Sequence, residues 1–182
     1  MGAAMVINTQ FNFWTDHASE LVLGQVETKM KWDDLADQVC SVARTTAVIG
    51  DRWTLMVLRD CFLGVRRFEG FQDRLGISRT LVAARLKHLT DEGVLTKVAY
   101  QTKPVRYEYR LTEKGLALHP LILAIVHWGD RFYAGDAGPP MLHRHKGCGC
   151  DFSPVTTCSA CGEAVGARDV EARAGQGLAI PG

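Results

Sequence analysis

The chain has 182 residues, of which 47% are hydrophobic and 23% charged. This composition excludes a largely disordered chain and suits one domain with a small appendage. No apolar run approaches the roughly 18 residues that a membrane helix needs, so we expect no membrane partner. The net charge is only +1, but residues 66–114 hold eleven Lys/Arg against six Asp/Glu. This local excess predicts a polyanionic partner, although a solvated basic face would give the same count.

The N-terminus lacks a basic segment followed by an apolar segment, so we expect no secretory signal. Residues 1–30 are interpreted as an N-terminal extension. They could be an ordered arm, or translation could begin at Met30, and the sequence favours neither. Four of the six cysteines lie within 148–161. Without an export signal, such clustering favours metal ligands over a disulfide framework.

Residues 31–135 carry a dense apolar periodicity and form the predicted main domain. A first helix continues to Val48 and ends at Gly50. Asp51 is the predicted N-cap of a second helix, and a short third helix ends at Gly76. The apolar positions that support the first helix are Leu35, Val39, Val42 and Ala43.

A fourth helix is predicted to begin at Ser78 and to bury a stripe formed by Val82, Leu86 and Leu89. Arg85 flanks this stripe and is a candidate for a salt bridge. After Gly93 the period changes to that of strands.

Segments 94–100 and 105–111 are rich in β-branched and aromatic residues, and 101–104 between them predicts a hairpin loop. Thr112 then caps a final helix, in which Gly115 and Pro120 predict a kink or restart near the beginning.

Three short helices (the second, third and fourth), then a hairpin and a long helix predict a mainly α fold with a small β-hairpin wing (α+β), the winged helix-turn-helix. In that fold the helix after the tight turn enters the major groove, and the hairpin wing contacts the DNA backbone or the minor groove. The long C-terminal helix is the expected dimerisation helix.

The polar side of the fourth helix is the predicted DNA-reading face. Its alanines permit close approach to the groove floor, although helix propensity explains them equally well. Arg79 lies at the helix N-terminus, where it can reach a phosphate or a base edge. The short basic hairpin loop suits phosphate contacts. The predicted DNA-binding residues are Ser78, Arg79, Thr80, Ala83, Ala84, Lys87, His88, Gln101, Lys103 and Arg106.

An ordered set of motifs in this region resembles the HxlR-type family, bacterial winged helix-turn-helix transcription regulators related to the MarR group. The resemblance covers about residues 33–135. The motifs include Ile49-Gly-Asp-Arg-Trp-Thr-Leu, Leu75-Gly-Ile-Ser, Glu92-Gly-Val-Leu, Tyr107-Glu-Tyr-Arg-Leu-Thr-Glu-Lys-Gly and Trp128-Gly-Asp.

The resemblance implies a homodimer on a pseudo-palindromic double-stranded DNA operator, in a bacterial cytoplasm at the nucleoid. It implies that the first and last helices of the domain form the dimer interface, and it allows a small-molecule effector. The expected interface residues on the last helix are Leu121, Ile125, Trp128 and Phe132. A purely intrachain core role for that stripe is the alternative.

Cys40 lies near the cysteine that several family members use as a thiol sensor. Arg44, one helical turn later, could favour the reactive thiolate. A lone helical cysteine is more often a small buried hydrophobe, so both interpretations stay open.

Residues 136–142 form a Gly/Pro linker, 143–165 a Cys/His appendage, and 166–182 a tail expected to be disordered. The ligand pairs His145-x2-Cys148 and Cys158-x2-Cys161 have the spacing of a tetrahedral structural zinc site. Cys150 could replace His145 as the fourth ligand. A redox disulfide or unligated thiols are the alternatives.

These features predict a zinc-containing, sequence-specific DNA-binding regulator that acts by occupying an operator, modulated by a ligand or a thiol modification, and not an enzyme. A protein-interaction adaptor built on the winged helix and the zinc ribbon is the alternative. A thiol-dependent enzyme lacks a convincing base or cofactor loop in this sequence.

Overall fold

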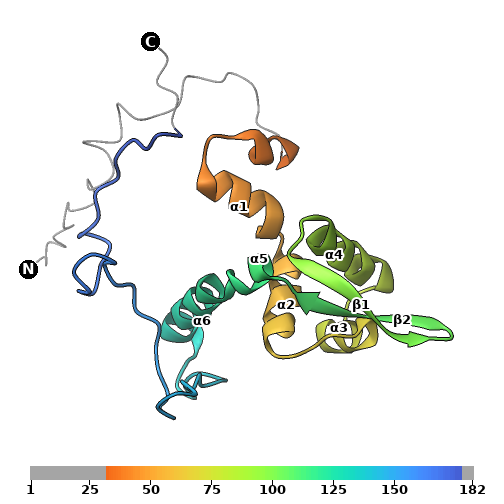
Figure 1. The fold of residues 1–182 in the computed structure, drawn as a ribbon. Helices are drawn as coiled ribbons and strands as arrows, with labels where there is room; N and C mark the ends of the chain where they lie inside the picture. The colour runs from red at the N-terminus through yellow and green to blue at the C-terminus, as the bar shows by residue number, and fades with distance from the viewer. Residues whose placement is uncertain (1–31, 178–182) are drawn as a thin grey trace, which may run out of the picture.

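The computed structural model describes residues 32–177, and this part of the chain is mostly helical with one two-stranded antiparallel hairpin (Figure 1). The elements, in chain order, are the 3-10 helix η1 (Trp32–Asp37), α1 (Ser41–Ile49), α2 (Arg52–Phe62), α3 (Phe68–Leu75), α4 (Arg79–Asp91), β1 (Leu95–Thr102), β2 (Val105–Leu111), α5 (Glu113–Leu116) and α6 (His119–Tyr133). This order is the predicted winged helix-turn-helix order. The predicted extension 1–30 and the last five residues of the predicted tail lie outside the described residues.

One apolar core joins the helices to the base of the hairpin. Phe71 of α3 is fully buried and meets Tyr109 of β2 edge to face, with ring centroids 6.4 Å apart. The buried hydrophobic residues of this core are Ile49, Val57, Leu58, Phe71, Val82, Leu86, Leu89, Val94, Leu95 and Ile122. The core therefore fixes α4 and the hairpin relative to one another.

The predicted helix caps are confirmed. The Asp51 carboxylate accepts hydrogen bonds from the N–H groups of Trp53 and Thr54, both at 3.0 Å. The Ser78 hydroxyl accepts from the Leu81 N–H at 3.3 Å. Gly76 ends α3 with a φ of 62°, a left-handed conformation that glycine adopts without strain.

The prediction of one continuous first helix is wrong. The chain breaks between η1 and α1, and Cys40 is the extended N-cap of α1 (φ −134°, ψ 118°) rather than a residue inside a helix. The Arg44 side chain donates to the Gln38 carbonyl across this break, at 2.7 Å. Val39 and Val42 are 62% and 74% exposed. The apolar spacing therefore did not mark a face packed on the core of this chain.

The hairpin is longer and its turn tighter than predicted. Gln101 pairs with Arg106, beyond an irregularity in the register between Ala99 and Gln101, so that only two residues, 103 and 104, link the strands. Gln101 and Thr102, predicted to lie in the loop 101–104, therefore belong to β1. The extra residue at the irregularity shifts the register, and the strands stay paired up to the turn.

The predicted restart before the last helix is confirmed, since α5 and α6 are separate elements. Gly115 of α5 is buried against the start of β1, and a Cβ there would lie 2.3 Å from the Val94 carbonyl oxygen. The Thr112 N–H and hydroxyl also bond this oxygen, at 3.1 and 3.2 Å. One backbone group thus connects the hairpin to the helix that follows it.

Helices α1 and α6 project from the body formed by α2, α3, α4 and the hairpin, on the side away from the hairpin tip (Figure 1). From residue 134 to residue 177 the chain forms turns and isolated bridges without a helix or strand. In the part of the chain that the structure describes, no helix is both long and apolar enough to cross a membrane.

Candidate nucleic-acid interface

Helix α4 separates a buried stripe from a solvent-facing surface. Val82, Leu86 and Leu89 are fully buried. The face opposite combines two basic side chains, one hydroxyl and two alanines, and all of these residues are exposed: Arg79, Thr80, Ala83, Ala84 and Lys87. A basic helix face with small side chains at its centre can approach a polyanionic groove closely.

Arg79, the first residue of α4, is held by the preceding helix. Its Nη1 donates to the Gln72 side-chain oxygen at 2.9 Å, and its guanidinium lies 4.8 Å from the centroid of the Phe68 ring. Sequence reasoning missed both positioning residues. They lie seven and eleven residues earlier on α3, and no local pattern links them to Arg79.

Two further ion pairs organise α4. Lys87 pairs with Asp91 one turn later, so its ammonium already has a carboxylate partner on the exposed face. Arg85 Nε lies 3.3 Å from the Asp51 carboxylate and ties α4 to the N-cap of α2. The prediction of a salt-bridge role for Arg85 is thereby confirmed.

His88 differs from its neighbours in the predicted DNA-binding set. It is half-buried, and its Nε2 lies 2.8 Å from the Val48 carbonyl oxygen of α1. The ring therefore points toward the body of the protein and connects α4 to α1. His88 is therefore not part of the exposed face of α4.

The hairpin places its basic residues at the tip. Lys103 and Arg106 are exposed there, and the Gln101 side-chain amide donates to the Lys103 carbonyl at 3.0 Å. This bond uses an amide hydrogen of Gln101 to hold the two-residue turn. Ser78, at the other end of the surface, is exposed and uses its oxygen as the α4 cap.

The base of the hairpin is joined to α3 by the residues just before that helix. The Tyr109 N–H donates to the Arg66 carbonyl at 2.7 Å, and Arg67 forms an isolated bridge with Glu108. The Glu108 carboxylate lies 3.0 Å from Arg110 and 3.4 Å from Arg67. These two guanidinium groups, Arg110 above all, lower the pKa of Glu108 below its ordinary value.

A buried carboxylate joins α2 to α3 behind this surface. Asp60 has no exposed area, and its Oδ1 lies 2.8 Å from Arg59 and 3.3 Å from Arg74. The Asp60 carbonyl also accepts from the Val65 N–H at 2.9 Å, within the turn that leads into α3. The carboxylate thus fixes the helix that in turn holds Arg79.

Known proteins are similar to this chain in sequence. The HxlR-like helix-turn-helix family matches residues 48–136. An uncharacterized HTH-type transcriptional regulator of Mycobacterium tuberculosis, Rv3095, is 42% identical over 138 residues, which are 76% of this chain and 87% of the relative. This chain belongs to the HxlR-like helix-turn-helix family.

Two solved structures are similar to this HxlR-like protein. The crystal structure of PA1607, described as a transcription factor, is 33% identical with a TM-score of 0.69 and covers 76% of this chain and 96% of its own. PA1374 from Pseudomonas aeruginosa, described likewise, is 29% identical with a TM-score of 0.55 and covers 77% and 95%. Membership of the family assigns the HxlR-like protein a role in transcription regulation through DNA binding.

Helix α6 of this HxlR-like protein carries an unpartnered apolar stripe. Leu121 and Ile125 are 39% and 44% exposed, and Trp128 and Phe132 are 56% and 58% exposed, with ring centroids 5.5 Å apart. Only Ile122 of α6 is buried among the described residues. The stripe therefore does not serve the core of its own chain.

The two cysteines that precede the tail, Cys40 and Cys61, differ in environment. Cys40 is exposed at the start of α1, beside the exposed Val39 and Val42. Burial, together with the neighbouring Asp60 carboxylate, raises the pKa of the Cys61 thiol to about 12. Cys61 is therefore a neutral thiol at physiological pH, whereas Cys40 is accessible to reagents.

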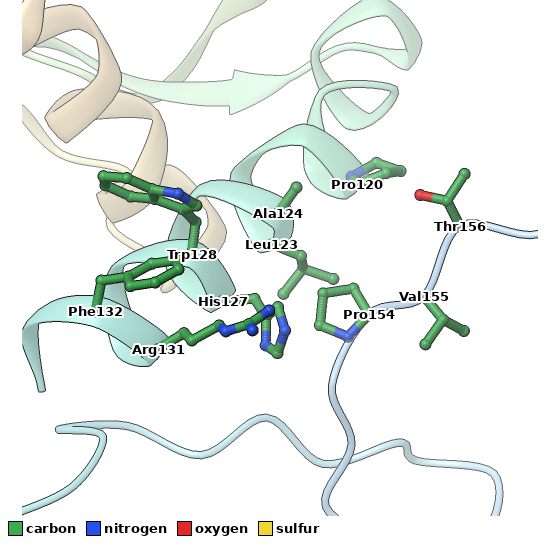
Figure 2. A pocket seen from close by; sticks show the side chains of 10 residues that line it. All are labelled: Pro120, Leu123, Ala124, His127, Trp128, Arg131, Phe132, Pro154, Val155 and Thr156. Carbon is green, nitrogen blue, oxygen red and sulfur yellow. The ribbon is translucent and has the colours of Figure 1, made fainter. Parts of the chain in front are cut away.

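The tail of the HxlR-like protein passes along α6 and leaves a cleft of about 420 Å³ between them. Figure 2 shows Pro154 of the tail opposite Leu123 and His127 of α6, with Trp128 and Phe132 on the same helix. The cleft therefore shares two aromatic side chains with the exposed stripe.

The predicted metal ligands lie in two separate turns of this tail. His145 Nδ1 lies 3.3 Å from Cys148 Sγ in the first turn. In the second, backbone N–H groups of Cys161 and Ala160 and the Cys161 thiol donate to Cys158 and lower its pKa. Within residues 32–177, no three His, Cys, Asp or Glu side chains gather into a group that could hold a metal ion. The structure thus brings each pair together but not the four residues.

Proposed function

We propose that this protein is a homodimeric, sequence-specific transcriptional regulator that inserts α4 into the major groove and contacts the DNA backbone with the β1–β2 hairpin. The observation that carries the proposal is the exposed basic face of α4, whose first residue, Arg79, is fixed on α3 by Gln72. A guanidinium with a fixed position can read a guanine edge or clamp a phosphate.

The DNA-facing surface consists of α4 and the hairpin tip: Ser78, Arg79, Thr80, Ala83, Ala84, Lys87, Gln101, Lys103 and Arg106. Helix α4 supplies base contacts, and the basic tip supplies phosphate contacts that make affinity depend on salt. The common core fixes the angle between these two parts.

A second copy of the chain covers the α6 stripe. Leu121, Ile125, Trp128 and Phe132 recur at helical spacing and leave a row of apolar side chains in water, as an obligate helix–helix interface does in a separated protomer. Two chains related by a two-fold axis would present two α4 helices to half-sites about 34–36 Å apart.

Affinity would respond to changes at this interface. Cys40 is exposed next to Val39 and Val42, so an oxidised thiol there would alter an apolar contact surface. The cleft beside α6 would let a small-molecule effector touch Trp128 and Phe132. Either event changes the separation of the two α4 helices and hence operator affinity.

The test is a titration of the purified protein with duplex DNA from its own upstream region and with scrambled duplex, over a salt series. We expect the upstream duplex to bind more tightly, with a logarithmic salt slope that Arg106→Ala reduces by about 0.9. Arg79→Ala should reduce the preference for the upstream duplex. Arg173→Ala, which removes an exposed tail guanidinium, is the control.

Equal and salt-labile binding to both duplexes would overturn sequence-specific reading and favour a protein-interaction adaptor. Dimerisation is tested separately by sedimentation of Ile125→Asp, which places a charge in the stripe and should give monomers. Val170→Asp, at an exposed apolar residue of the tail, is its control. A dimeric Ile125→Asp variant would exclude the α6 stripe as the interface.

A further inference from the structure

The tail contains two turns with the same backbone hydrogen bonds, thirteen residues apart. In the first, the His145 N–H donates to the Cys150 carbonyl at 2.9 Å and the Gly149 N–H to the His145 carbonyl at 2.8 Å. In the second, the Cys158 N–H donates to Glu163 and the Gly162 N–H to Cys158, both at 2.8 Å.

The correspondence extends to the flanking residues. The bridge between Arg144 and Asp151 corresponds to the bridge between Thr157 and Ala164. Gly149 and Gly162 have φ values of 74° and 79° at equivalent places. The chain therefore builds the same small loop twice.

This equivalence decides which side chains correspond. His145 occupies the place of Cys158, and Cys148 the place of Cys161. Cys150 occupies the place of Glu163, after the glycine, and its Sγ lies 3.7 Å from the Cys148 carbonyl oxygen. The side chain that matches a ligand in the second turn is therefore His145, and Cys150 is outside the repeated pair.

Within each turn the two donor atoms already converge. Zinc–nitrogen and zinc–sulfur bonds of about 2.0–2.1 and 2.3 Å at a tetrahedral angle place the two donors about 3.6 Å apart. The separation of His145 Nδ1 and Cys148 Sγ is 3.3 Å. In the other turn, the backbone N–H groups of Ala160 and Cys161 hydrogen-bond the Cys158 sulfur, which fixes the position of this side chain.

No hydrophobic core accounts for these turns. Large apolar side chains beside and between the turns are largely exposed, with Leu142 at 67%, Phe152 at 41% and Val155 at 76%. A segment of this size without a core is commonly held by a metal. We propose that one zinc ion per chain joins the two turns, with His145 Nδ1, Cys148, Cys158 and Cys161 as its four ligands.

Residues 151–157 connect the two turns, and Pro154 at their centre lies on α6 in the cleft of Figure 2. Closure of the turns around zinc would fold this connection into a ribbon seated on the helix proposed to form the dimer. Four protein ligands leave no position for a water or substrate, so the metal would be structural.

The test uses the full chain, purified without chelator. Its zinc content is measured by mass spectrometry, and Co²⁺ replacement is followed by the visible absorption of tetrahedral cobalt. We expect one metal per chain, with tetrahedral bands and sulfur-to-cobalt charge transfer. His145→Ala and Cys161→Ser should each weaken metal binding at least tenfold, and Cys150→Ser and Cys40→Ser should leave it unchanged.

A metal-free protein that also fails to take up Co²⁺ would overturn the proposal. Half a metal per chain would show a site shared between protomers, and loss of binding in Cys150→Ser with retention in His145→Ala would show the wrong ligand set. Circular dichroism of each variant separates a lost metal from a lost HxlR domain, because α1 to α6 lie outside the tail. DNA binding by the α4 variants tests the proposed function independently.

Discussion

Arg79 Nη1 and the Gln72 side-chain oxygen lie 2.9 Å apart. Helix α3 therefore positions this arginine before any DNA is bound. Loss of this bond leaves Arg79 charged but free to sample other rotamers. We expect Gln72→Ala to weaken operator binding by about 1 kcal/mol, roughly fivefold in Kd, with little effect on folding.

The measurement is fluorescence anisotropy with the operator duplex, alongside thermal unfolding. Arg79→Ala provides the upper limit of the effect, and the double variant should be no weaker than Arg79→Ala alone. Additive losses would show that Gln72 acts independently of Arg79.

In the proposed complex, Asp91 competes with DNA for Lys87, because the two side chains already form an ion pair on the exposed face of α4. Asp91→Asn removes that competitor and a negative charge from the surface proposed to face phosphates. We expect operator affinity to rise about fivefold at low salt, and the gain to shrink as salt increases. Lys87→Ala should have the opposite effect. Weaker binding by Asp91→Asn would mean that the carboxylate positions Lys87 for contact.

Asp60 is a buried carboxylate held by two partly exposed arginines, Arg59 and Arg74. Its replacement by Asn removes the attraction between the carboxylate and the two guanidinium groups. It also buries an amide whose N–H groups have no suitable acceptor. We expect Asp60→Asn to lower the free energy of unfolding by about 2–3 kcal/mol in urea denaturation. Asp91→Asn, on the surface, is the matched control and should shift it by less than about 0.5 kcal/mol. Equal free energies of unfolding for the two variants would show that the Asp60 carboxylate does not stabilise the fold.

Cys61 should resist thiol reagents, because its pKa of about 12 leaves little thiolate at pH 8. We expect its reaction with a disulfide reagent to be at least a hundredfold slower than that of Cys40 in the folded protein. The difference should vanish in denaturant. The Cys61→Ser variant should lose the slow phase alone, and a single common rate for all thiols of the native protein would contradict this assignment.

Glu108 makes the stability of the hairpin depend on pH. Its folded pKa lies below the ordinary value of 4.5, because Arg110 and Arg67 stabilise the carboxylate. The stabilisation is therefore complete above about pH 4.5 and is lost as the pH falls through the lower folded value. The unfolding free energy of Glu108→Gln should be below that of the parent at pH 7 and converge with it in acid. A difference in unfolding free energy that is the same at every pH would show that it does not arise from the charge of Glu108.

The sequence allowed local features to be predicted, and the ones that failed depend on distant contacts. Asp51, Ser78 and Gly76 act within three or four residues, so their capping roles could be predicted from the chain alone. The stripe with Val39 and Val42 indicated a continuous helix, but these side chains are exposed and cannot report a core.

The candidate site divides in the same way. The exposed face of α4 followed from helical periodicity, which separates it from the buried leucines. Periodicity did not indicate that His88 turns toward the body of the protein, because its ring contacts the Val48 carbonyl forty residues away in the chain. The Gln72–Arg79 pair could not be predicted, since it depends on the angle at which α3 and α4 meet. The repeated turns of the tail appeared only once their backbone hydrogen bonds were known.

The contact between Gly115 and Val94 has a mechanical consequence. The carbonyl at the base of the hairpin is fastened to Thr112 and packed against a position with no room for a methyl group. The hairpin is therefore tightly connected to α5, the helix that precedes α6. In the proposed dimer, a rotation of α6 that also moves α5 would change the orientation of the hairpin. Operator affinity would then depend on the orientation of the wing as well as on the spacing of the two α4 helices.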